Sequence, residues 1–186
     1  AMQVVEETGD EHENAVILNN AALSLMSAGK LPEALETGLR GLDLACQLGM
    51  TPFISNYHDT AAQIYLAMGD VESAESMLRT GLSLSTAKRP DYLLAAHTKD
   101  LGQVCLALGK FEEAAGLLHA AIADFKHLGV RGELALCYQL LSQLYERQGN
   151  FALALEQYKI YDEQREATIG KDVARRIDAL KANYDL

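Results

Sequence analysis

Apolar residues recur along the chain at the three- and four-residue spacing of amphipathic helices. Between residues 93 and 108 the apolar positions are Leu94, Leu101, Val104, Cys105 and Leu108. Between residues 112 and 128 they are Ala114, Leu117, Leu118, Ala121, Ile122 and Phe125. Gly109 and Gly129 are predicted to end these two segments, because glycine tolerates the left-handed backbone conformation found at helix C-termini. The pattern predicts a pair of helices.

The same turn signals return along the chain with a fixed period. Glycines stand at equal intervals, at Gly29, Gly69, Gly109 and Gly149. Each is followed at a constant distance by an alanine, at Ala34, Ala74, Ala114 and Ala154. A second, imperfect series comprises Gly9, Gly49, Arg89 and Gly129. Two turn signals in every period of about 40 residues predict tandem helix pairs, and a period of this length is typical of solenoids.

Small residues occupy positions where two helices of such a stack must approach closely. They are Ala22, Ala62, Gly102 and Ser142 on the first helices of the pairs, and Gly41, Gly81 and Ala121 on the second helices. A glycine inside a helix costs about 1 kcal/mol relative to alanine. Gly38, Gly41 and Gly81 are therefore expected at close helix contacts that offset this cost.

Three stretches carry a family resemblance: AAQIYLAMGDVESAESMLRTGLSL (61–84), LGQVCLALGKFEEAAGLLHAAI (101–122) and LLSQLYERQGNFALALEQYKIY (140–161). Each stretch has a small residue, a bulky residue three positions later, a glycine at the turn and an alanine after the turn. This order of residues resembles the tetratricopeptide repeat. The resemblance implies an all-α, right-handed solenoid of antiparallel helix pairs. With a period of about 40 residues, the repeats are longer than the common unit of about 34. Such lengthened repeats resemble those of bacterial signalling proteins and peptide-receptor regulators.

Four helix pairs are expected, at about 14–49, 54–88, 91–129 and 133–161. Residues 1–13 are expected to be the end of a truncated preceding repeat, which would make the chain an excerpt of a larger protein. Residues 162–186 are expected to form a C-terminal helix, and two interpretations of it stay open. It is a cap folded back on the last pair or a helix that leads into a coiled coil, and the two are compatible in a larger parent protein. The second interpretation depends on an apolar pattern with steps of 4, 3 and 4, formed by Val173, Ile177, Leu180 and Tyr184.

Composition and charge argue against several classes of function. The formal net charge of −10 makes nucleic-acid binding improbable, because an acidic surface repels phosphates. No apolar run approaches the roughly 20 residues needed to span a bilayer, and no signal-peptide pattern is present. Three cysteines, an odd number without metal-site spacing, are expected to be reduced core thiols of a cytoplasmic protein. They are Cys46, Cys105 and Cys137.

No catalytic motif, metal site or cofactor site is predicted. Gly29-Lys30 and Gly109-Lys110 are interpreted as turns, because the glycine-rich run of a phosphate-binding loop is missing. The five histidines are expected to have surface or packing roles, although His58 and His97 lie early in first helices and could line a groove. The chain is therefore not expected to be an enzyme.

The resemblance implies that the first helix of each repeat lines a concave groove. Candidate groove residues fall into rows that follow the period of the glycines, and several carry amides, which can donate to and accept from a peptide backbone at once. The candidate groove residues are Asn19, Leu23, Asn56, Asp59, Gln63, Lys99, Gln103, Gln139, Gln143 and Arg147. An ordinary polar surface remains the alternative interpretation. Chaperone-binding members of the family clamp the C-terminal carboxylate of their ligand. Asp59, beside Lys99, would repel such a carboxylate, so a chaperone cofactor is not expected.

Two hypotheses for function follow. The first is a non-catalytic module that binds a protein or peptide in its groove, as the sensor or scaffold segment of a larger bacterial signalling protein. The resemblance here is to sensor regions of diguanylate cyclases, adenylate cyclases and histidine kinases, whose last helix continues into the output domain. The second is an assembly scaffold, with a homodimer formed through the C-terminal helix, or an adaptor that docks on a regulator without a groove ligand.

Overall fold

The computed structural model describes the backbone of residues 2–85 and 91–184, and the side chains of residues 11–50, 53–85, 91–167 and 170. Within those residues the chain forms eight α-helices and no strand, which confirms the all-α prediction. The helices are α1 (Met2–Ser27), α2 (Leu31–Gln47), α3 (Thr51–Met68), α4 (Val71–Leu84), α5 (Tyr92–Ala107), α6 (Phe111–Leu128), α7 (Arg131–Arg147) and α8 (Phe151–Tyr184). None of them, as far as the chain is described, combines the length and the apolar character needed to cross a membrane.

The predicted glycine turns are confirmed. Gly29, Gly109 and Gly149 have a φ angle of 75° and Gly69 has one of 83°, in the left-handed region in which other residues are strained. At the turn after α3, the N–H groups of Gly69 and Asp70 donate to the carbonyls of Leu66 and Tyr65, and this closes the helix end. The second series also holds at Gly49 and Gly129, with φ of 64° and 70°. Arg89 lies outside the described residues.

Small residues sit at the predicted close contacts. Ala22 and Ala121 are fully buried, Ala62 is 1% exposed and Ser142 is 9% exposed. A Cβ added to Gly81 would lie 2.9 Å from the Cβ of His58, a distance at which neighbouring atoms must shift. A Cβ added to Gly41 would lie 3.1 Å from the Cβ of Leu18. These glycines therefore allow α2 and α4 to lie directly against the first helix of their own pair.

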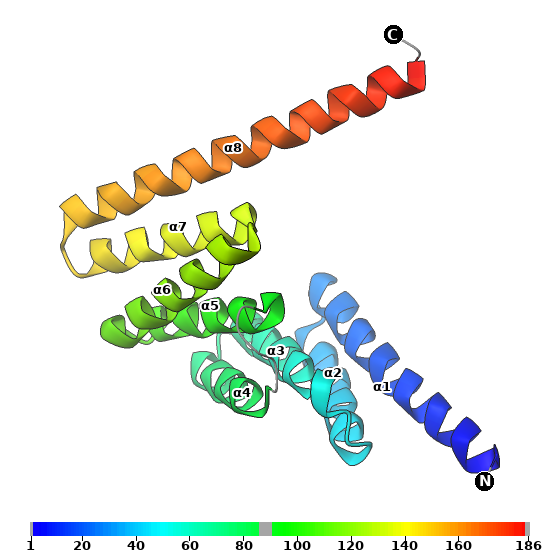
Figure 1. The fold of residues 1–186 in the computed structure, drawn as a ribbon. Helices are drawn as coiled ribbons and strands as arrows, with labels where there is room; N and C mark the ends of the chain where they lie inside the picture. The colour runs from blue at the N-terminus through cyan, green and yellow to red at the C-terminus, as the bar shows by residue number, and fades with distance from the viewer. Residues whose placement is uncertain (1, 86–90, 185–186) are drawn as a thin grey trace.

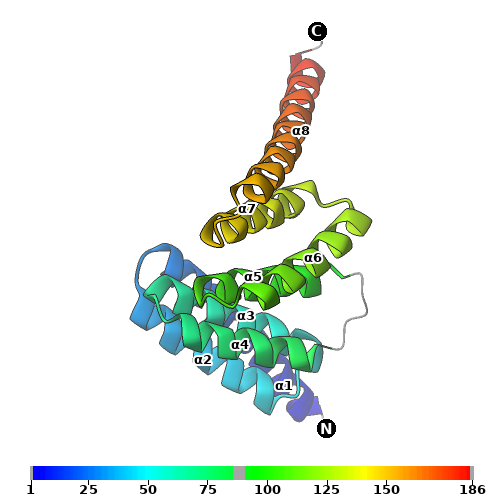
Figure 2. The same cartoon turned by 90° about the vertical axis from the view of Figure 1, so that its left-hand side faces the viewer.

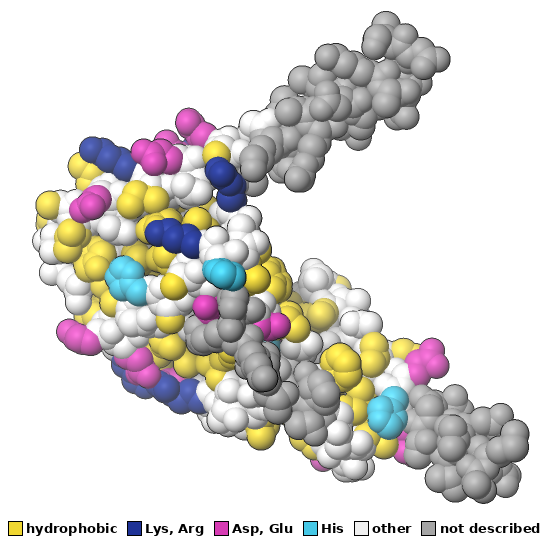
Figure 3. All heavy atoms as spheres, in the orientation of Figure 1, with side chains coloured by type: hydrophobic (Ala, Val, Ile, Leu, Met, Phe, Trp, Pro, Cys, Tyr) yellow, Lys and Arg dark blue, Asp and Glu magenta, His cyan; other side chains and the backbone are white. Residues whose placement is uncertain are grey.

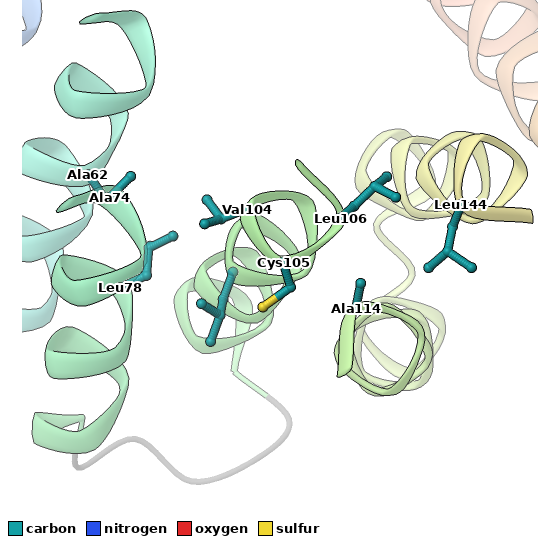
Figure 4. Packing of buried hydrophobic residues seen from close by; sticks show 9 residues of the cluster. Ala62, Ala74, Leu78, Val104, Cys105, Leu106, Ala114 and Leu144 are labelled. Atoms are coloured by element: carbon teal, nitrogen blue, oxygen red, sulfur yellow. The ribbon is translucent and has the colours of Figure 1, made fainter. Parts of the chain in front are cut away.

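Each helix packs on its neighbours in sequence, so that the pairs form a curved stack with α1 and α8 at opposite ends (Figure 1). The core runs through the stack as a chain of clusters. One of them joins α3, α4, α5, α6 and α7 through Ala62, Leu78, Val104, Ala114 and Leu144 (Figure 4). Because each cluster is shared by adjacent pairs, no pair buries its apolar face alone.

Two expected boundaries are not helix ends. α1 is continuous from Met2 to Ser27, across the expected division at residue 14 and through Gly9. α8 has 34 residues and continues past residue 161 in one direction, away from α7 (Figures 1 and 2). The first part of α8 packs on α7, and the described backbone beyond residue 161 continues the same helix. The stretch from Ile160 to Glu166 contains no glycine or proline that would end the helix. The side chains of Val173, Ile177, Leu180 and Tyr184 lie outside the described ones.

Candidate functional site

The predicted groove residues lie on α1, α3, α5 and α7, and we call the surface that they form the inner face. In the space-filling view the stack is indented between its α7 end and its α1 end (Figure 3). Lys99, Gln139, Asn19 and Asn56 are partly buried, whereas Gln103 and Gln143 are exposed. Within the described residues, one cavity lies at each end of the inner face.

The first cavity lies between α5 and α7 and has a volume of about 220 Å³. Its lining consists of Lys99, Gln103, Leu136, Gln139, Leu140 and Gln143. Four of the predicted groove residues therefore meet in one hollow, and three of them are glutamines. Their amides can both donate and accept hydrogen bonds, so this hollow suits a ligand with a peptide backbone.

Lys99 is the charged group of this cavity, and its ammonium already has partners. Its Nζ lies 2.7 Å from Oε2 of Glu133 on α7 and 3.2 Å from Oδ1 of Asp100. Burial alone would lower the pKa of Lys99, but Asp100 and Glu133 together raise it above its ordinary value. Lys99 thus remains a cation that joins α5 to α7, and a ligand carboxylate would have to compete with two protein carboxylates for it.

The second cavity lies between α1 and α3 and has a volume of about 270 Å³. Its lining consists of Val16, Asn19, Met50, Phe53, Asn56 and Tyr57. Sequence reasoning found the two asparagines and missed the four apolar residues. The repeat period contained a signal for one of them: Val16 shares a row with Asn56 and Leu136, one helical turn before the row of Asn19, and these three residues line the two cavities.

Between the two cavities lies Asp59, whose carboxylate is mostly buried. Its Oδ2 accepts a hydrogen bond from Nε2 of Gln63 at 2.7 Å and lies 3.7 Å from Nε2 of His97. Burial raises the pKa of Asp59 to about 7; the negative charge of Asp100 acts in the same direction, while Gln63 and Lys99 oppose it. Asp59 therefore titrates near neutral pH and is not a fixed negative charge of the groove.

The expectation that His58 and His97 could line a groove is not met, because both are buried, with exposures of 8% and 4%. The helix contacts explain this: the backbone of α4 at Gly81 lies against His58, and His97 faces Asp59. Burial lowers the pKa of both imidazoles, which favours their neutral forms. They belong to the packing of the stack.

Arg147 also has a structural partner. Its Nη1 donates to the backbone carbonyl of Leu106 at 2.6 Å, and its guanidinium lies 5.5 Å from the ring centre of Phe111. The side chain thus links the end of α7 to the turn between α5 and α6. We assign it to this contact and not to the cavity of the glutamines.

A cluster of possible metal ligands was missed by sequence reasoning. Atoms of Glu75, Cys105 and Glu113 lie within 4.8 Å of one another. Arg79 bridges the two glutamates at 2.7 and 2.8 Å, and Lys110 pairs with Glu75. Burial raises the pKa of the Cys105 thiol to about 11, which disfavours the thiolate that a metal requires. The cluster is therefore an ion-pair network between α4 and α6.

The prediction of three core thiols is wrong for one of them. Cys105 and Cys137 are buried, whereas Cys46 is exposed near the end of α2. The helical stripe of α2 places Leu42 and Ala45 toward the core, and Cys46, the next residue after Ala45, points away from it.

Comparisons with known proteins bear on the fold. Two family models described as tetratricopeptide repeat match residues 56–88 and 95–120. Residues 56–88 and 95–120 are tetratricopeptide repeats. Each matched segment covers most of one helix pair, α3–α4 and α5–α6. A comparison with curated protein sequences finds no match.

Solved structures share this repeat stack at low sequence identity. BtubC (BKLC) from P. vanneervenii is similar with a TM-score of 0.76 and 18% identity, over 84% of this chain and 65% of that protein. Aspartyl phosphate phosphatase F from Bacillus subtilis gives 0.75 and 18%, over 85% of this chain and 42% of the phosphatase. MamA gives 0.64 and 18%, over 84% and 81%. The chain thus spans less than two thirds of the length of the first and of the phosphatase.

The two matched repeats begin with α3 and α5, and α1 and α7 hold the same place in the helix pairs on either side; the inner face is built from these four helices. Tetratricopeptide repeats are in general non-catalytic surfaces for protein interaction. The two cavities lie between successive first helices, so each is lined by side chains from two helix pairs.

Proposed function

We propose that the inner face binds a peptide or an extended segment of a partner protein, and that the chain is a non-catalytic sensor or scaffold segment of a larger bacterial signalling protein. The observation that carries the proposal is the cavity between α5 and α7, where Gln103, Gln139 and Gln143 meet. Surface helix positions are more often occupied by Glu and Lys, which favour solvent over a ligand. Three amides around one hollow are suited to a peptide backbone.

The continuous helix α8 supports the second part of the proposal. An unbroken helix of 34 residues that begins in the last repeat can transmit a change in the stack to whatever it joins. A ligand shifts such an equilibrium only if it prefers one arrangement of the repeats over another. Small rotations between repeats add up along a solenoid, which gives the inner face and α8 a mechanical connection.

The test uses peptides selected from a random display library on the immobilised chain. Changing Gln103→Ala and Gln143→Ala together is expected to weaken a selected peptide about tenfold or more, because each lost hydrogen bond contributes about 1 kcal/mol. Fluorescence anisotropy with the labelled peptide measures the affinity. Gln47→Ala, which removes an exposed amide of α2, is the matched control and is expected to leave the affinity unchanged. An unchanged affinity of the double variant would contradict the proposal.

The second candidate function is an assembly scaffold or an adaptor that docks on a regulator without a groove ligand. It is favoured by an apolar strip on α8, where Phe151, Leu155 and Tyr158 are 70%, 55% and 48% exposed. In the preceding repeat the equivalent of Tyr158 is Leu118, which is fully buried. Two results would favour this function: a dimer by light scattering, and selected peptides whose affinity is the same for the natural chain and the double glutamine variant.

A further inference from the structure

We propose that the apolar strip of α8, formed by Phe151, Leu155 and Tyr158, packs against α1 of a second copy of the chain, so that copies stack head to tail. The contact repeats, between two molecules, the junction that joins each helix pair to the next within one chain. The inference goes beyond peptide binding at the inner face and does not depend on it. Three observations carry it: the residues that are equivalent by the repeat period, the sizes of the two faces and the lengths of the two helices.

The strip lies on the face of α8 that is covered on the second helices of the preceding pairs. Within the chain, α2 packs against α3, α4 against α5 and α6 against α7. The equivalents of Tyr158 are Leu78 in α4 and Leu118 in α6, with exposures of 2% and 0%, whereas Tyr158 is 48% exposed. Leu118 packs in one cluster with Leu141 of α7. The strip is therefore a junction surface whose covering helix is absent from the described part of the chain.

The matching surface is on α1, on the side by which α3, α5 and α7 cover the preceding helix. Ile17 is 56% exposed, whereas its equivalents are buried: Tyr57 in α3 is 4% exposed and Cys137 in α7 is fully buried. Ser24 is exposed as well. Its equivalents in the other first helices are fully buried, and they are Ile64, Val104 and Leu144. The two halves of a junction thus lie at opposite ends of the stack (Figure 1), and a second copy brings them together.

The two faces are complementary in size. In the α6–α7 junction the small residue is on the second helix and the large one on the first, since Ala115 and Leu144 belong to one cluster. Between copies this order is reversed, because the equivalent residues are Leu155 and Ser24. The hydroxyl of Ser24 already donates to the carbonyl of Asn20, so covering it leaves no donor unpaired. Two strips of α8 facing each other would oppose large residues to large residues, which makes α1 the better complement.

The lengths of α1 and α8 fit the same arrangement. They have 26 and 34 residues, whereas the six helices between them have 14 to 18. By the repeat period, α8 begins where α6 begins and α1 ends where α7 ends, so the added lengths are at the end of α8 and at the start of α1. In the α6–α7 junction the end of α6 lies beside the start of α7, because the turn at Gly129 joins them. In stacked copies the two added lengths therefore run side by side.

The energetics of this contact set its behaviour in solution. Covering Phe151 and Leu155, which are 70% and 55% exposed, is favourable in proportion to the apolar area removed from water. The net charge of −10 on each copy opposes association, and salt screens that repulsion. A head-to-tail contact leaves one free strip and one free α1 on every assembly, so growth continues past the dimer into a ring or a filament.

Disulfide trapping tests which helix covers the strip. Two chains carry Cys46→Ser, which removes the exposed natural thiol; one also carries Leu155→Cys and the other Ser24→Cys. Under mild oxidation the mixture is expected to form a disulfide between the two kinds of chain. Neither chain alone is expected to form more dimer than the Cys46→Ser parent. Efficient dimerisation of the Leu155→Cys chain alone would place α8 against α8 and overturn the proposal, and so would a mixture that forms no disulfide.

Sedimentation velocity measures the association without a cross-link. In about 0.3 M salt, which screens the repulsion between copies, the sedimentation coefficient of the natural chain is expected to rise with concentration past the dimer value. Leu155→Asp is expected to weaken the association at least about tenfold, because it places a charge in an apolar contact. Phe53→Asp, at a position of the inner face that is 54% exposed, is the matched control and should leave it unchanged. A natural chain that stays monomeric at every concentration would overturn the stacking and assign the strip to another occupant.

Discussion

Replacing Asp59 by Asn is expected to stabilise the chain at pH 8 by about 2–4 kcal/mol more than at pH 4, because the substitution removes a carboxyl whose pKa is raised in the folded state. Burial raises that pKa to about 7, whereas the carboxyl of an unfolded chain titrates near about 3.9. Between these values the folded chain holds a proton that the unfolded chain has lost. The free energy of unfolding of the natural chain therefore falls as the pH rises from about 4 to about 7. Asparagine has no such titration and keeps the shape of the side chain.

Urea unfolding at pH 4 and pH 8 measures this difference. Asp43→Asn, at an exposed position of α2, is the matched control. This change is expected to alter stability by less than about 0.5 kcal/mol at both pH values. The titration of His58 is present in all variants and largely cancels in the comparison, whereas His97 and Asp100 interact with Asp59 and contribute to the measured difference. If Asp59→Asn shifted stability equally at the two pH values, Asp59 would have an ordinary pKa and would be a fixed charge of the inner face.

Phe125→Ala is expected to lower the free energy of unfolding by about 3–5 kcal/mol. Phe125 is fully buried at the junction of the last two repeats, in a cluster with Leu118, Cys137 and Leu141. Its removal leaves a cavity between α6 and α7 that the surrounding helices fill only in part. Phe151 carries the same side chain at a position that is 70% exposed. Phe151→Ala is therefore expected to cost less than about 0.5 kcal/mol.

Cys137 reports the same cavity without denaturant. Burial raises the pKa of its thiol to about 12, so that it is unreactive in the natural chain. Phe125→Ala is expected to speed its reaction with a disulfide-forming thiol reagent, with the exposed Cys46 as the internal reference. Equal unfolding free energies for Phe125→Ala and Phe151→Ala would show that the repeats do not share the continuous core described above.

Most of the fold could be predicted from the sequence because its turns depend on single residues. Gly69 must adopt a positive φ, and Ala74 must fit against the neighbouring helix. The regular spacing of such residues therefore predicts a stack of helix pairs. The course of α8 could not be predicted in the same way. Residues 151–169 contain neither glycine nor proline, so tertiary contacts decide the course of the helix there, and the pattern allowed two outcomes.

The candidate site could be predicted only in part. The amides of Gln103 and Gln143 stand out because polar residues recur on one helix face. The apolar wall at Phe53 does not stand out, since an apolar residue on a helix is normally assigned to the core. Contacts such as Asp59 with His97 join residues of different repeats, and their distances depend on the rotation between repeats. No local pattern encodes that rotation.

The measurement that tests the central claim most directly is the location of a bound peptide on the isotope-labelled chain. A peptide selected from the display library is titrated in, and the backbone amide resonances of all helices are followed by NMR. We expect the largest shifts of backbone amide resonances on α5 and α7, on the side of Gln103 and Gln143. The resonances of α2, α4 and α6 are expected to stay nearly unchanged. Shifts confined to α2, α4 and α6, or to the apolar strip of α8, would contradict the claim that the inner face is the binding surface.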